Sequence, residues 1–186
     1  RRYNVVTSTW ESVGEGFNDR VNSLAVAPNG EVYAGGGFTK SGNTALGGVA
    51  RWDGTKWNDV GGGVDDGVRE ITFGSDGKLY VGGQFSRAGG VAAGNVAVWD
   101  GSSWDGMNGG VYGGGSVNGV FDLSVDSMNR VYISGDFDAA EADNTRLNKV
   151  AVYEGGKWNA LGSGLGNSTS QIVNTVVTDG EDAYFG

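Results

Sequence analysis

The segment EVYAGGGF at residues 31–38 returns as KLYVGGQF at 78–85 and as RVYISGDF at 130–137. A second phrase follows each copy and reads VARWDG at 49–54, VAVWDG at 96–101 and VAVYEG at 150–155. A third phrase opens with a tryptophan at positions 10, 57, 104 and 158, so its copies are 47, 47 and 54 residues apart. Self-similarity at a period of this length indicates a repeat architecture.

Each repeat is predicted to contain four short strands, which in the first copy cover about 21–26, 31–38, 49–54 and 56–60. These stretches are rich in Val, Tyr, Phe and Trp and are bounded by Gly, Asn and Asp, which is typical of strands. Asn29-Gly30 and Asp76-Gly77 supply the positive φ of a tight hairpin turn, and Asn129 takes that place in the third copy. The predicted fold is therefore all-β, a β-propeller of four-stranded antiparallel blades. The aromatic residues that recur at one place per repeat are expected to pack between blades.

The glycine pair in the second strand, the aromatic residue in the third and the tryptophan that opens the fourth resemble a kelch-like repeat. The fuller phrase GGxF…VAxWDGxxW resembles more closely the propeller repeats of bacterial secreted proteins and of fungal cortical cell-polarity markers. The resemblance covers essentially the whole chain. It implies a propeller fold and is consistent with a module at the cell surface or outside the cell.

The order of the strands suggests how a ring could close. We expect one domain, residues 1–186, with repeats at about 10–56, 57–103, 104–157 and 158–186 plus 1–9. The chain opens with a third and a fourth strand and ends with a first and a second, which predicts four blades whose last blade combines both ends of the chain. This ring is a monomer. Two alternatives are a homodimer that shares an eight-bladed ring and a piece of a longer repeat protein.

Composition excludes several kinds of chemistry. The 186 residues include 37 glycines but no histidine or cysteine, so a Ser-His-Asp triad, a cysteine nucleophile and thiolate or imidazole metal sites are impossible. Thirteen basic and 22 acidic residues give a net charge of −9, which disfavours nucleic-acid and anionic-membrane partners. The sequence also contains no apolar run long enough for a membrane span. No cofactor is expected, apart from a structural ion or water held by backbone groups in a central channel.

Two classes of loop, from fourth strand to first and from second to third, are long and variable. Propeller topology places both classes on one face, where we expect binding to occur. The predicted partner is a glycan or a protein. The candidate ligand-binding residues in these loops are Phe17, Asp19, Asp65, Asp66, Arg87 and Tyr112.

The densest group of carboxylates is Asp136, Asp138, Glu141 and Asp143, which is a candidate calcium site because calcium prefers several oxygen ligands from one loop. Its spacing is not that of an EF-hand. Three functions compete, and the leading expectation is a non-catalytic binding or scaffold module. The second is an architectural repeat unit. The third is a carboxylate-based glycoside hydrolase or lyase, in which Asp65 or Asp66 faces Asp138 or Glu141.

Overall fold

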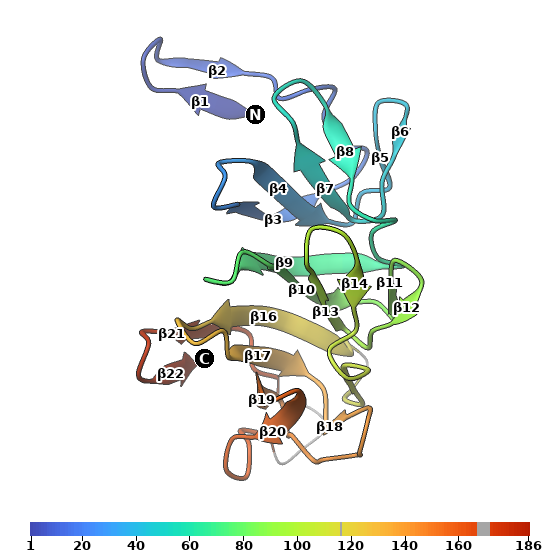
Figure 1. Ribbon diagram of the computed structural model, residues 1–186, viewed down its shortest axis with the longest axis vertical. Helices are drawn as coiled ribbons and strands as arrows, with labels where there is room; N and C mark the ends of the chain where they lie inside the picture. Colours follow the sequence, from blue (N-terminus) through green and yellow to red (C-terminus); the bar gives the residue numbers. More distant parts are fainter. Residues whose placement is uncertain (116, 167–171) are drawn as a thin grey trace.

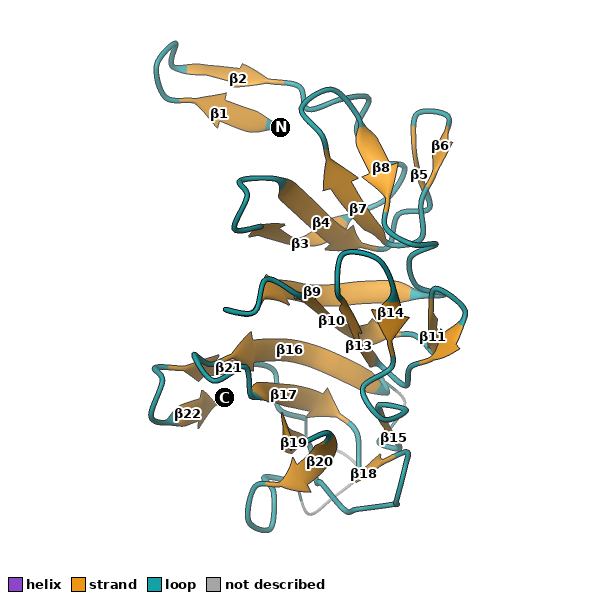
Figure 2. Ribbon diagram, in the orientation of Figure 1, coloured by secondary structure: helices purple, strands orange, loops and turns teal. Residues whose placement is uncertain are grey.

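Three four-stranded antiparallel sheets form the body of the molecule in the computed structural model, which describes residues 1–115, 117–166 and 172–186 (Figure 1, Figure 2). Within each sheet the strands are hydrogen-bonded in chain order, as in a propeller blade. No helix long and apolar enough to cross a membrane occurs in these segments. The first blade contains β3 (Val21–Val26), β4 (Val32–Gly36), β7 (Val49–Trp52) and β8 (Trp57–Asp59); the second β9 (Gly67–Phe73), β10 (Leu79–Gln84), β13 (Val96–Trp99) and β14 (Trp104–Asp105); the third β16 (Gly119–Val125), β17 (Val131–Asp136), β19 (Val150–Glu154) and β20 (Lys157–Ala160).

The predicted turn chemistry is confirmed between the first two strands of each blade. Gly30 and Gly77 have φ values of 86° and 74°, and Asn129 has a φ of 60° at the matching place in the third blade. Asparagine tolerates this left-handed conformation better than other residues with a side chain. A repeat counted from one tryptophan to the next supplies the last strand of one blade and the first three strands of the following blade.

Neighbouring blades pack face to face through a glycine. A Cβ on Gly35 of β4 would lie 2.7 Å from Val68 Cγ1 and 2.8 Å from Ile71 Cγ2 of the next blade. A Cβ on Gly82 of β10 would likewise lie 2.7 Å from Val120 Cγ1. The glycine therefore lets the branched side chains of the following first strand approach the sheet closely.

In the three complete blades the tryptophan of the fourth strand is buried in the seam with the preceding repeat, as expected, whereas Trp10 is 66% exposed. The indole N–H of each buried tryptophan donates to a backbone carbonyl of the preceding repeat: Trp57 to Val13 at 3.2 Å, Trp104 to Val60 at 2.9 Å and Trp158 to Met107 at 3.0 Å. Each seam is thereby fixed by apolar burial and by one hydrogen bond.

The two ends of the chain do not share a blade. β1 (Arg2–Asn4) pairs only with β2 (Thr9–Glu11), and β21 (Val176–Thr178) pairs only with β22 (Ala183–Phe185). The prediction of a ring closed by a combined last blade is therefore wrong for this arrangement. The physical reason is the geometry of stacking, because three complete blades hold β1 and β22 at opposite ends of the stack (Figure 1). The described strands consequently enclose no central channel for the expected ion or water.

Short strands mark one edge of the stack (Figure 1). β5 (Lys40–Ser41) pairs with β6 (Thr44–Ala45), β11 (Arg87–Ala88) with β12 (Val91–Ala92), and β15 (Val111–Tyr112) with β18 (Ala139–Ala140). All of them belong to the long loops between second and third or fourth and first strands. We call this edge the loop face.

Candidate functional site

Asp65 ties two loops of the second blade together. Its carboxylate accepts hydrogen bonds from Ser86 N at 2.8 Å, Ser86 Oγ at 2.6 Å and Arg87 N at 2.9 Å. Partial burial opposes ionisation, but these hydrogen bonds prevail and hold the pKa of Asp65 below its ordinary value. Asn18 makes the same type of contact with Thr39 and Lys40 in the first blade. Asp65, which was predicted to bind a ligand, therefore has a structural role.

An acidic cavity opens where the loops of the second and third blades meet. Its volume is about 420 Å³. Asp65, Asp66 and Tyr112, which were predicted from the sequence to bind a ligand, all line it together with Glu141. The remaining polar lining consists of neutral groups, namely Gln84, Ser86, Asn95 and Asn118. We call this space the acidic cavity.

Tyr112 lies at the rim of the acidic cavity and is held there from two sides. Its hydroxyl is hydrogen-bonded to Asn144 Oδ1, and its backbone carbonyl accepts from Asp138 N at 2.8 Å. Asn95 Nδ2 donates to the carbonyl of the adjacent Val111 at 2.9 Å. Tyr112 is 36% exposed, so it offers a fixed aromatic surface to a ligand.

Three predicted ligand-binding residues lie outside the acidic cavity. Phe17 stacks on Phe38 with ring centroids 4.0 Å apart and is partly buried against the core of the first blade, so its prediction as an exposed contact is wrong. Its repeat position is apolar in every copy, which was the available signal. Asp19 is exposed and accepts from the adjacent Arg20 N at 2.7 Å. Arg87 Nη1 donates to Gly90 O at 2.9 Å within its own hairpin.

The carboxylates proposed for calcium are instead divided among different tasks. Lys149 Nζ lies 2.9 Å from Asp136 Oδ1 and 2.8 Å from Asp138 Oδ1. Burial alone would lower the pKa of the Lys149 ammonium, but the hydrogen bonds to Asp138 and Asp136 raise it. The hydrogen bond from Lys149 in turn lowers the pKa of Asp138. We call these three residues the ion cluster.

The other two members of the proposed calcium site lie apart from the ion cluster. Asp143 Oδ1 accepts from Thr145 N at 3.0 Å in a local turn, and Glu141 lines the acidic cavity. Among the described residues, no three carboxylates are placed to hold a metal ion together. The predicted calcium site is therefore not formed, and the Lys149 ammonium already neutralises buried Asp136 and half-exposed Asp138.

A second cavity, of about 380 Å³, was not expected from the sequence and is lined by residues of all three complete blades. It is lined by Arg20 and Arg69 and by no carboxylate. The Arg69 guanidinium carbon lies 4.5 Å from the centre of the Phe121 ring, and its Nη2 donates to Gln84 Oε1 at 3.0 Å. Its Nε is buried and has no hydrogen-bond partner among the described residues. We call this space the basic cavity.

The acidic and basic cavities adjoin each other. Gln84 lines both, while Asp66 and Gly67, adjacent in the chain, line one each. Burial, reinforced by the charge of Arg20, lowers the pKa of Arg69. On the loop face, the guanidinium groups of Arg20 and Arg69 therefore line the basic cavity. The exposed carboxylates of Asp66 and Glu141 line the adjoining acidic cavity.

Residues 2–182 match the family model described as the Rax2 C-terminal beta propeller domain. The chain belongs to this family. The resemblance to the propeller repeats of fungal cell-polarity proteins is thereby confirmed. No curated protein matches the chain significantly.

Solved structures support the same fold for this Rax2-family propeller, with 21 matching chains. One is a structure of YCF48 bound to D1 peptide, with a TM-score of 0.50 and 15% sequence identity. The match covers 95% of this chain and 49% of that one, so the chain spans about half the length of the YCF48 chain. At this identity the similarity establishes a shared fold and nothing about ligands.

Proposed function

We propose that this Rax2-family propeller is a non-catalytic binding module that recognises a protein partner on its loop face. The observation that carries the proposal is the pair of adjoining cavities of opposite charge, which share Gln84 as a common wall. A polypeptide that presents a carboxylate beside an ammonium complements this arrangement. Electrostatic complementarity of this kind provides specificity and orientation.

The state of the carboxylates supports binding rather than catalysis. Hydrolysis of a glycoside requires a carboxylic acid whose pKa is raised so that it can donate a proton. In the pairs singled out from the sequence, hydrogen bonds lower the pKa of both Asp65 and Asp138. Both are thus best suited to remain ionised and to hold loops in place.

The charge pattern can be tested with a random peptide display library screened against the immobilised protein. We expect enriched peptides to carry acidic and basic residues close together. Arg69→Gln should weaken binding of these peptides, and so should Asp66→Asn combined with Glu141→Gln. Arg87→Gln, on the same face but outside both cavities, and Glu154→Gln, on the opposite face, are the matched controls. Binding that is equal in all variants would show that the two cavities are not the site.

A glycan is the second candidate ligand because Tyr112 presents an aromatic surface beside amide and carboxylate groups. Aromatic rings pack on the apolar faces of sugars while polar neighbours bond the hydroxyls. A glycan array distinguishes the candidates, since a carbohydrate ligand should be lost in Tyr112→Ala and retained in Arg69→Gln. We propose, in line with the family assignment, that binding takes place outside the cell or at its surface.

A further inference from the structure

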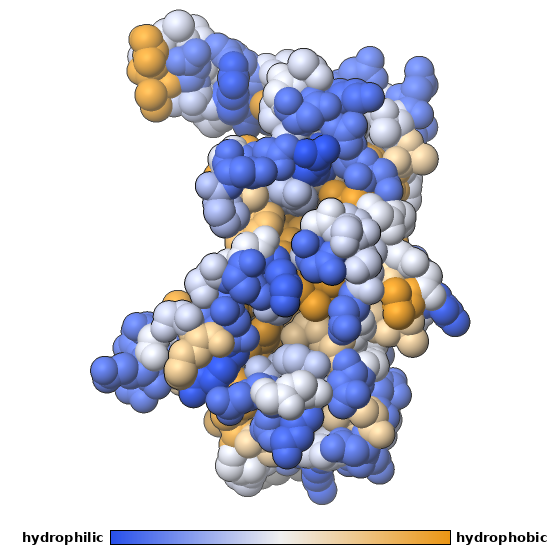
Figure 3. Space-filling view, in the orientation of Figure 1, coloured by the Kyte–Doolittle hydropathy of each residue, from blue (hydrophilic) through white to orange (hydrophobic). Residues whose placement is uncertain are grey.

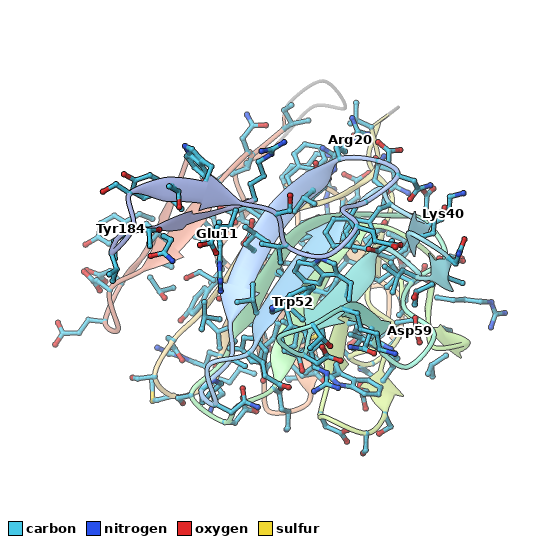
Figure 4. All side chains as sticks on the ribbon, turned by 90° about the horizontal axis from the view of Figure 1, so that it is seen from above. Glu11, Arg20, Lys40, Trp52, Asp59 and Tyr184 are labelled. Carbon is cyan, nitrogen blue, oxygen red and sulfur yellow. The ribbon has the colours of Figure 1, made fainter. Side chains whose placement is uncertain are left out.

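A third cavity, of about 570 Å³, lies between the first two complete blades and is formed by their residues alone. It reaches Asn29 in the hairpin turn of the first blade and Gly77 and Gly101 in two turns of the second, at the ends of the strands away from the loop face. It shares no lining residue with the acidic or the basic cavity. In Figure 4, Asp59 of this cavity and Arg20 of the basic cavity lie on opposite sides of the first blade. We call this space the turn-face cavity.

Three aromatic side chains supply the apolar part of the turn-face cavity. Tyr33 comes from β4 of the first blade, and Phe73 and Trp99 come from β9 and β13 of the second. Tyr33 and Phe73 meet edge to face with ring centroids 5.2 Å apart. Phe73 and Trp99 are only partly buried, so both rings keep some surface free. Hydrophobic residues are visible between the first two blades in Figure 3, with hydrophilic residues on either side.

The hydroxyl of Tyr33 has no hydrogen-bond partner in the part of the chain that the structure describes, although Tyr33 is only 8% exposed. In the second blade the matching hydroxyl of Tyr80 donates to Asp76 Oδ2 at 3.2 Å. Asn29 stands at the place of Asp76, but its Nδ2 donates to Glu31 Oε2 at 2.8 Å and its Oδ1 accepts from Glu31 N at 3.0 Å. A nearly buried polar group without a partner is costly. The Tyr33 hydroxyl is therefore available to a ligand in the cavity.

The charged residues of the turn-face cavity depart from the repeat. Arg51 Nη1 and Glu31 Oε1 form an ion pair, and Asp59 Oδ2 accepts from Gly62 N at 2.6 Å. Positions at which a chain breaks its own pattern are expected at functional sites. The first blade has Glu31, Arg51 and Asp59 where the second has Lys78, Val98 and Gly106 and the third has Arg130, Val152 and Ala160.

The seam between the second and third blades shows the same place without these changes. It also contains a cavity, of about 430 Å³, which is lined by Tyr80 and by Val98 at the place of Arg51. The Tyr80 hydroxyl is already bonded to Asp76. A cavity at this place is thus a general result of blade stacking. The free phenol and the Glu31–Arg51 pair belong to the first seam.

We propose that the turn-face cavity is a second binding site, separate from the loop face, and that it takes a neutral sugar ring of a glycan. Its volume falls within the range of roughly 300–1,000 Å³ that is usual for small-molecule sites. A sugar hydroxyl both donates and accepts hydrogen bonds, so it can bond the Tyr33 hydroxyl, the Asp59 carboxylate and the Arg51 guanidinium. The apolar face of the ring packs on the free surface of Trp99.

The charges of the turn-face cavity favour a neutral ligand. An anion would approach the carboxylates of Glu31 and Asp59, and a cation would approach the guanidinium of Arg51. A group with either charge therefore meets a like charge in the same space. Hydroxyl groups gain hydrogen bonds from both kinds of side chain without this cost.

An array of neutral oligosaccharides built from glucose, galactose, mannose and N-acetylglucosamine tests the proposal, followed by titration calorimetry of any oligosaccharide that binds. We expect Tyr33→Phe to weaken binding about tenfold, because it removes only the hydroxyl that bonds the sugar. Arg51→Val, which installs the residue of the second blade, should weaken binding as well. Tyr80→Phe makes the same change in the second seam and should leave binding unchanged. Thermal unfolding checks that each variant stays folded.

Variants of the loop face separate this site from the site proposed there. Tyr112→Ala and Arg69→Gln alter the acidic and basic cavities and should leave sugar binding in the turn-face cavity unchanged. Absence of binding to every oligosaccharide on the array would overturn the proposal. So would a bound sugar that is retained equally in Tyr33→Phe and Arg51→Val, or one that is lost in Tyr112→Ala.

Discussion

Replacing Lys149 by asparagine tests how the third blade tolerates buried charge. Asn95 holds the same place in the second blade with a φ of 66°, while Lys149 has a φ of 76°. The backbone thus accepts asparagine, and the effect of the change comes from the ion cluster. Asp136 and Lys149 side chains are each 2% exposed, so the substitution leaves Asp136 buried without its countercharge.

Loss of one partner from a buried ion pair costs about 3–5 kcal/mol. We expect Lys149→Asn to lower the free energy of unfolding by this amount, measured by equilibrium unfolding in urea. The repair is suggested by the second blade, in which Gln84 stands at the place of Asp136. Asp136→Gln combined with Lys149→Asn should recover most of the loss, because no buried charge then remains unpaired. A loss below about 1 kcal/mol, or a double variant no more stable than Lys149→Asn, would refute the reasoning.

The pH dependence of the same pair of proteins gives an independent check. The pKa of Asp138 is lowered in the folded state, so its contribution is present above about pH 3.9 and is lost as the pH falls through the folded pKa. The pKa of Lys149 is raised, so its contribution is present below about pH 10.4 and is lost as the pH rises through the folded pKa. The stability difference between the unchanged protein and the double variant should therefore be flat near neutrality and change at both extremes.

Three further predictions concern single positions. Asp65→Ala should destabilise the protein by about 0.5–1.5 kcal/mol in urea unfolding because the exposed donors Ser86 N and Arg87 N lose their acceptor within the protein, whereas Asp65→Asn should be tolerated as Asn18 is in the first blade. Gly82→Ala should lower the stability measured by thermal unfolding by about 1–3 kcal/mol, since its Cβ would lie 2.7 Å from Val120 Cγ1. Gly67→Ala is the control, because the space around Gly67 is open. Burial and the charge of Asp122 raise the pKa of Glu70, so its ionisation weakens the fold as the pH rises above about 4.3 toward the raised pKa. Glu70→Gln should remove this decline in stability, and an unchanged pH profile would contradict the assignment.

Much of the architecture follows from contacts that repeat along the chain. Strand order, the left-handed turn residues Gly30, Gly77 and Asn129, and the seam tryptophans were all predictable because each depends on one repeat and its neighbour. The exposure of Phe17, by contrast, could not be predicted from its place in a loop. Its position alternates with glycine as in a loop, but the structure packs its ring on Phe38.

The candidate site was predictable only in part. Asp66, Tyr112 and Glu141 were singled out as loop residues, but their convergence depends on how the second and third blades stack. The basic cavity was missed because Arg69 lies within a strand whose pattern looked structural, and its neighbour Arg20 comes from another repeat.

The blade is encoded locally, since its alternating residues, turns and tryptophans act between segments that are adjacent in the chain or one repeat apart. Which charges meet, and whether the ring closes, depends instead on how the blades stack. Lys149 neutralises Asp136 and Asp138 because the folded loops bring the three together in a site where an unpaired charge is costly. Closure depends on the rotation accumulated over all blades, which no single repeat encodes, and three complete blades leave β1 and β22 apart.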